Sequence, residues 1–94
     1  MSKPAETVRI RVAGRVQGVA FRAWTKRQAD ELGVSGWVRN EPDGTVSALV
    51  SGSPAAVATM CERLRQGPPA ARVDTLGVEP VDTGASEGGF RVLR

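Results

Sequence analysis

The chain has 94 residues, enough for one domain, and a formal net charge of +3. It contains no histidine, which excludes acid–base catalysis by imidazole and metal sites that use imidazole ligands. Its one cysteine, Cys61, excludes an intramolecular disulfide. We find neither a charged leader followed by an apolar run nor a long apolar segment, so we expect a cytoplasmic protein without a membrane partner.

Positive charge is concentrated in the first third of the chain. Residues 1–27 hold seven basic side chains and one acidic side chain, a local charge of +6, which leaves −3 for the remainder. This asymmetry favours an anionic partner, either a small phosphate or carboxylate or a nucleic acid, although a solvated basic surface explains it equally well. We expect a single domain over residues 1–94, with residues 1–5 flexible.

The first two elements are a strand and a helix. Residues 7–13 read TVRIRVA and alternate apolar with basic side chains, which predicts a half-buried strand. Apolar side chains then recur at helical spacing from Phe21 to Leu32, and Gly33 is a typical helix stop. The segment GRVQGVAFR, residues 14–22, therefore places two glycines in the connection between strand and helix.

Five further elements follow. Ser53 and Pro54 are typical of a helix N-cap and first turn. Within residues 72–81, expected to form the fourth strand, the apolar side chains shift from odd to even alternation, which predicts a β-bulge. The expected spans are strands over 34–40 and 45–52 joined by the turn EPDG, a helix over 53–66, a strand over 72–81, a polar turn over 82–89 and a short strand over 90–94.

This order is the split β-α-β arrangement of ferredoxin-like folds. We expect an α+β fold, a ferredoxin-like βαββαβ sandwich with both helices on one face of an antiparallel sheet and a short extra C-terminal strand. In that topology the first two strands run in the same direction with the third between them. The loop after the first strand and Asn40, at the end of the second, should then share one rim. Trp24 and Trp37 are expected in the core.

The loop after the first strand has the features of an anion site. Gly14 and Gly18 permit positive φ and close approach of the backbone, and the loop runs into a helix N-terminus whose first N–H groups lack partners. Consecutive amides and the helix dipole bind anions, and Arg22 can add a bidentate contact to a phosphate. Taken alone, a purely structural glycine turn is the simpler explanation, because the loop matches neither common nucleotide-binding motif.

The remaining polar residues narrow the chemistry. The Asn40 amide can orient a water molecule, although asparagine is also favoured at the start of a turn. We find no metal-ligand cluster and no Ser-His-Asp arrangement in the sequence. Without a base, nucleophile or metal, the site suits a phosphate whose leaving group departs unaided. Acyl phosphates meet this condition, because the carboxylate's conjugate acid has a pKa of about 4.

The motifs GRVQGVAFR and GWVRN, separated by a helix ending in LG and followed by DGTV and GPPAARV, resemble the acylphosphatase family from about Val8 to Val92. The resemblance implies a ferredoxin-like fold and hydrolysis of acyl phosphates to a carboxylate and phosphate, without cofactor or metal. It implies that Arg22 and Asn40 are catalytic. It assigns phosphate binding to Gly14, Arg15, Val16, Gln17, Gly18, Val19, Ala20 and Arg22.

In the mechanism that the resemblance implies, Arg22 and the loop amides hold the phosphate, Asn40 orients the attacking water, and a phosphate oxygen takes the proton. Two positions depart from the family pattern. Ala20 stands where a larger, commonly aromatic residue is frequent, and Glu41 stands where threonine or an apolar residue is common. Neither change removes a catalytic group, but a carboxylate facing the site would weaken phosphate binding.

Two other classes of function stay open. One is a non-catalytic phosphate-binding or protein-interaction module on the same fold. The other is a nucleic-acid-binding domain, which the basic first third favours. Such domains stack bases on aromatic side chains of the central strands, and residues 7–13 and 45–52 contain none. We therefore expect no nucleic-acid partner, and a monomer that binds a small acyl phosphate and releases inorganic phosphate.

Overall fold

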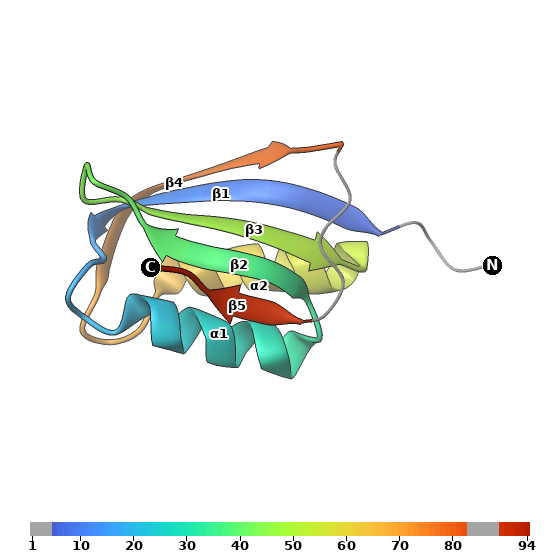
Figure 1. Ribbon diagram of the computed structural model, residues 1–94, viewed down its shortest axis with the longest axis horizontal. Coiled ribbons are helices and arrows are strands. Elements are labelled where there is room, and N and C mark those ends of the chain that lie inside the picture. The colour runs from blue at the N-terminus through green and yellow to red at the C-terminus, as the bar shows by residue number, and fades with distance from the viewer. Residues whose placement is uncertain (1–4, 83–88) are drawn as a thin grey trace.

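The computed structural model describes residues 5–82 and 89–94. The predicted element order and the ferredoxin-like fold are confirmed (Figure 1). The polar turn predicted over 82–89 and the predicted flexible N-terminus lie largely outside the described residues. The elements are β1 (Glu6–Arg15), α1 (Phe21–Leu32), β2 (Ser35–Asn40), β3 (Val46–Gly52), α2 (Pro54–Gln66), β4 (Arg72–Pro80) and β5 (Phe90–Val92).

The five strands form one sheet in the order β4-β1-β3-β2-β5. As predicted, β1 and β2 run in the same direction, because each pairs antiparallel with β3 between them. The sheet differs from the expected antiparallel one at one edge, where β5 pairs parallel with β2. β4 runs opposite to β1, whereas β5 runs in the same direction as β1 and β2. The sheet is therefore mixed.

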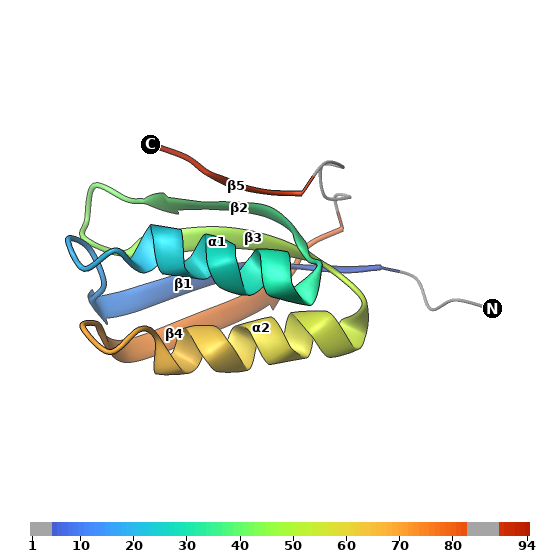
Figure 2. The same cartoon turned by 90° about the horizontal axis from the view of Figure 1, so that it is seen from below.

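Both helices cover the same face of the sheet (Figure 2), and the core lies between this helical layer and the sheet. The alternation of β1 buries every second side chain, while the intervening arginines point to the other face. No helix within the described residues is long and apolar enough to cross a membrane. The core side chains include Val8, Ile10 and Val12 of β1, Phe21 and Ala29 of α1, and Val57, Met60 and Leu64 of α2.

The predicted bulge lies opposite the end of β1. The register passes from Ala13 opposite Thr75 to Gly14 opposite Val73, so Asp74 is the extra residue of β4. Gly14 has φ 132° at this point, and a Cβ there would overlap the carbonyl oxygen of Arg72. Close approach of β4 thus explains why this position is a glycine.

The two tryptophans have different surroundings. Trp24 is half-buried and packs against the core, with its ring centroid 5.6 Å from that of Phe21. The prediction that Trp37 lies in the core is wrong. Successive side chains of a strand point to opposite faces, and Val38 takes the core-facing phase of β2. Trp37 therefore lies on the face away from the helices, opposite Leu49, with the Arg39 guanidinium carbon 4.9 Å from its ring centroid.

Candidate active site

Three segments meet at one end of the sheet: the loop between β1 and α1, the end of β2, and the residues that follow β5 (Figure 1). They enclose a hollow of about 820 Å³. The loop and Asn40 therefore share a rim, as the topology predicts. The lining residues are Val16, Gly18, Ala20, Phe21, Arg22, Ala23, Asn40, Val92 and Arg94.

The loop presents a series of unpaired backbone donors. None of the N–H groups of residues 16–23 donates to an acceptor within residues 5–82 or 89–94, and the first bond of α1 runs from Trp24 N to Ala20 O, at 3.0 Å. Gly18 has φ 74°, and Ala20, the N-cap, is left-handed with φ 60° and ψ 28°. Unpaired amides at the head of a helix bind anions, and the helix dipole adds to the attraction.

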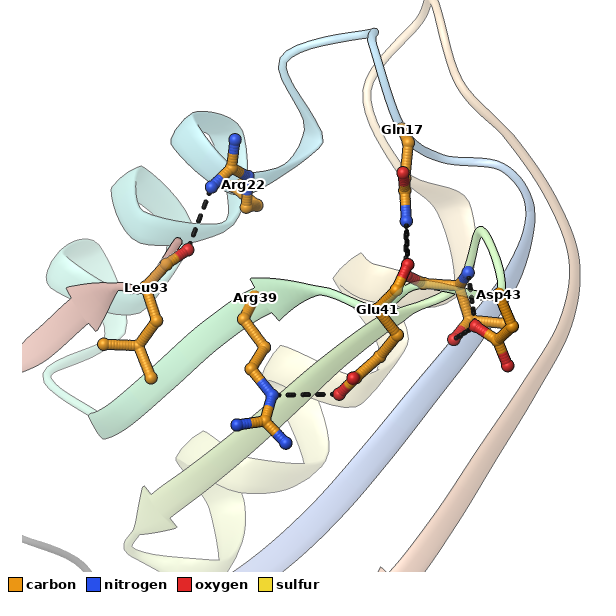
Figure 3. A network of polar contacts seen from close by, with 7 residues as sticks. Gln17, Arg22, Arg39, Glu41, Asp43 and Leu93 are labelled. Carbon is orange, nitrogen blue, oxygen red and sulfur yellow. Dashed lines mark hydrogen bonds and ion pairs between the residues drawn. The ribbon is translucent and has the colours of Figure 1, made fainter.

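Arg22 lies in the first turn of α1 and is held by the C-terminal segment (Figure 3). Its Nη1 donates to the carbonyl oxygen of Leu93 at 2.9 Å, and the Leu93 N–H donates to Val38 O at 2.8 Å. β2 therefore fixes Leu93, and Leu93 orients the guanidinium. A guanidinium has five N–H donors, so others stay available for a ligand in the hollow.

Asn40 is the last residue of β2 and lies opposite Val46. It shares the parity of Val38, which points toward the helices, so its side chain faces the same side of the sheet as α1. In the part of the chain that the structure describes, its side-chain amide forms no hydrogen bond. The amide therefore has both its acceptor and its donors available for a water molecule or a substrate oxygen.

The geometry brings backbone N–H groups at the head of α1, a guanidinium and a carboxamide around one hollow. A family model described as acylphosphatase matches residues 8–92. The chain belongs to the acylphosphatase family. A protein named acylphosphatase from Mesorhizobium japonicum is 50% identical over 93 residues, covering 99% of each chain.

Solved structures agree with this family assignment. The crystal structure of acylphosphatase from Bacillus subtilis is 32% identical, covers 95% of this chain and 99% of its own, and superposes with a TM-score of 0.90. Full-length HypF in its phosphate- and nucleotide-bound form is 20% identical, with a TM-score of 0.84 over 97% of this chain and 12% of its own. That second likeness shows a shared fold alone.

Five of the residues that the acylphosphatase resemblance selects lie on the hollow: Val16, Gly18, Ala20, Arg22 and Asn40. The other four are not among its lining residues. Gly14 and Arg15 pair with β4, and Val19 packs partly against the core. The side chain of Gln17 turns toward the β2–β3 turn, where its Nε2 lies 2.8 Å from Glu41 O and 2.9 Å from Thr45 O (Figure 3).

Sequence reasoning missed two features of this candidate site. It considered only the backbone of Gln17, so the side-chain link to the turn was not foreseen. It also did not place Val92 and Arg94 at the hollow, because the parallel pairing of β5 beside β2 was not expected. No local signal indicated either feature, because both depend on contacts between residues far apart in the sequence.

The carboxylate of Glu41 points away from the loop. Its Oε2 lies 2.9 Å from Nε of Arg39, on the side of the sheet that Trp37 occupies (Figure 3). Hydrogen bonds from Arg39 and then Ser47 hold the pKa of the Glu41 carboxyl below its ordinary value. This departure from the family pattern therefore places no carboxylate in the hollow.

Proposed function

We propose that this chain hydrolyses acyl phosphates to a carboxylate and inorganic phosphate. The observation that carries the proposal is the shared hollow, in which Arg22 and Asn40 lie at the head of α1 beside backbone amides without acceptors in the described chain. Membership of the acylphosphatase family supports the same reaction.

Each group of the hollow has a role in this reaction. The amides of residues 16–20 and the Arg22 guanidinium bind the phosphoryl oxygens and stabilise the charge of the transition state. Asn40 orients the attacking water, whose oxygen bonds to phosphorus as the bond to the acyl oxygen breaks. The carboxylate leaves with the bonding electrons, and a phosphate oxygen takes the proton of the water.

The proposed reaction needs neither a metal nor a cofactor. The leaving carboxylate is a weak base that departs without protonation, and guanidinium and backbone N–H groups neutralise the phosphate charge. The groups that the proposed reaction uses, namely the loop amides, Arg22 and Asn40, come from a single chain, so the reaction requires no second copy and we propose a monomer. Cys61 as the only cysteine fits the proposed cytoplasmic location.

The test measures phosphate release from benzoyl phosphate in the presence of a chelator. We expect turnover by the wild type, poor turnover of a stable alkyl phosphate ester, and a loss of about 2–4 kcal/mol of transition-state stabilisation in Asn40→Ala. Asn40→Ala should still bind inorganic phosphate, whereas Arg22→Gln should bind it weakly. Arg27→Gln removes an exposed positive charge from the same helix and serves as the matched control.

Undiminished hydrolysis by a folded Arg22→Gln or Asn40→Ala variant would contradict the role given to that residue. Inhibition by the chelator would contradict the metal-free reaction. Phosphate binding by the wild type without any turnover would indicate the alternative, a non-catalytic phosphate-binding or interaction module on this fold.

A further inference from the structure

The face of the sheet opposite the helices is not covered by either helix (Figure 2). Here the side chains of neighbouring strands align in rows set by the pairing register. Two such rows define what we call the open face. One row comprises Glu79, Arg9, Leu49, Trp37 and Arg91, and the next comprises Gly77, Arg11, Ser47 and Arg39.

The open face carries more guanidinium groups than carboxylates. Arg9 and Arg11 form no ion pair within residues 5–82 and 89–94, whereas Glu41 is already bound by Arg39. Arg91 is exposed and shares the face by register with Trp37. The excess of positive charge gives this surface an affinity for anions that is separate from that of the hollow.

A second cavity, of about 510 Å³, lies on the open face where Arg9 and Arg11 adjoin β4. Its lining comprises Arg9, Ile10, Arg11, Ser47, Gly77, Val78 and Glu79, so two guanidinium groups and one carboxylate face it. Gly77 has no side chain, and a Cβ at this position would meet nothing within 4 Å. Alternate residues of one strand stand about 7 Å apart, so the two guanidinium groups form a short basic track rather than a single anion pocket.

An aromatic platform lies beside this basic track. Trp37 is half-buried, two strands away from Arg9, and the Arg39 guanidinium lies over its ring at 4.9 Å. Unpaired bases stack on aromatic rings and on guanidinium planes. A small anion has no ring that could stack on this platform.

We propose that the open face binds a single-stranded polynucleotide, with phosphates on Arg9 and Arg11 and a base stacked on the pair formed by Trp37 and Arg39. The two central strands, β1 and β3, carry no aromatic side chain. The structure places the tryptophan of β2 on the same face as the arginines of β1. Charge complementarity and the stacking platform together favour a flexible strand with unpaired bases over a duplex.

The experiment measures the fluorescence anisotropy of labelled 12-nucleotide RNA and DNA of the same mixed sequence, titrated with the full chain at several salt concentrations. We expect saturable binding that weakens with salt. The double variant R9Q/R11Q should bind about ten-fold more weakly or worse at low salt, and its slope of log affinity against log salt should be smaller in magnitude by about 1.4. Trp37→Leu should weaken binding about five-fold.

The matched control is R27Q/R65Q, which removes the same charge from exposed positions on the two helices and should bind as the wild type does. Phosphate release from benzoyl phosphate reports that each variant is folded, because the hollow with Arg22 lies apart from the open face. Binding to RNA and DNA alike supports backbone and base contacts, and a preference for RNA supports an added contact to the 2′-hydroxyl.

Three results would overturn the proposal. One is the absence of saturable binding by the wild type at low salt. Another is an equal loss of affinity in R27Q/R65Q and R9Q/R11Q, which would indicate net charge alone. The third is displacement of the oligonucleotide by inorganic phosphate together with loss of binding in Arg22→Gln, which would place the strand in the hollow instead.

Discussion

The side-chain amide of Gln17 donates a hydrogen bond to the main-chain carbonyl of Glu41, the residue that follows Asn40, at 2.8 Å. The same nitrogen lies 2.9 Å from Thr45 O, across the turn between β2 and β3 (Figure 3). One side chain thus ties the loop that leads to Arg22 to the end of the strand that carries Asn40. The relative position of the two proposed catalytic residues depends on this link.

Replacing Gln17 with leucine should reduce turnover more than it reduces stability. Both carbonyls keep another donor, because Gly44 N bonds to Glu41 O at 3.2 Å and Glu41 N bonds to Thr45 O at 2.9 Å. We therefore expect a loss of about 1 kcal/mol in the free energy of unfolding. Misplacement of the loop should lower kcat by about ten-fold or more, since small errors in position are costly in catalysis. Denaturant unfolding and steady-state kinetics measure the two effects.

The variant Gln17→Glu serves as a control for the direction of this hydrogen bond. At neutral pH its carboxylate faces two carbonyl oxygens without a proton to donate, so it should be less active than Gln17→Leu. Its kcat relative to that of Gln17→Leu should rise as the pH falls and the carboxyl is protonated. Equal activity of both variants across this pH range would contradict the link.

The two glycines of the loop should respond differently to alanine. A Cβ on Gly14 would overlap Arg72 O and come within 2.8 Å of Asp74 N, so Gly14→Ala should destabilise the fold by about 3 kcal/mol or more. Gly18 has φ 74° and open space around its Cβ position, so Gly18→Ala costs only the left-handed conformation, about 1–2 kcal/mol. Denaturant unfolding compares them, and equal losses would contradict the close approach at Gly14.

The sequence predicted those parts of the site that local patterns determine. The alternation of β1, the glycine after α1 and the Ser53 cap each specify an element, and the element order then specifies the topology. Since β1 and β2 must run in parallel in that topology, the shared rim of the loop and Asn40 followed without any contact being known.

The parts that could not be predicted depend on non-local pairing or on side-chain direction. The parallel pairing of β5 with β2 brings Val92 and Arg94 to the hollow, and no residue of β5 specifies which edge it joins. Trp37 was placed in the core because of its size. Its neighbour Val38 shows that register outweighs size in deciding which face a strand residue occupies.

Glu41→Gln should change the pH dependence of stability without changing catalysis. Hydrogen bonds from Arg39 and Ser47 hold the pKa of Glu41 below its ordinary value of 4.5. The ionised group therefore stabilises the fold at pH values above 4.5, and this contribution is lost as the pH falls through the lower pKa of the folded state. We expect wild type to exceed the variant in stability by a constant amount at neutral pH, and the difference to shrink in acid.

Denaturant midpoints measured between pH 3 and pH 7 check this expectation for Glu41. Phosphate release at neutral pH should stay within about two-fold of the wild type, because the carboxylate is bound to Arg39 on the open face. A marked rise in phosphate affinity in Glu41→Gln would contradict the placement of this side chain away from the hollow.

Ala20→Gly should stabilise the protein, although glycine usually weakens a helix end. Among the described residues, Ala20 is the one non-glycine residue with positive φ, at 60°. The left-handed conformation costs alanine about 1–2 kcal/mol, and glycine removes this cost. Glycine also raises the conformational entropy of the unfolded chain, which cancels about half of the benefit. We expect a net gain of about 0.5–1 kcal/mol in the free energy of unfolding, measured with denaturant.

The matched control is Ala23→Gly in the first turn of α1, where the backbone is helical and glycine should cost about 0.5–1 kcal/mol. Destabilisation by both substitutions would show that the loop holds Ala20 at no conformational cost.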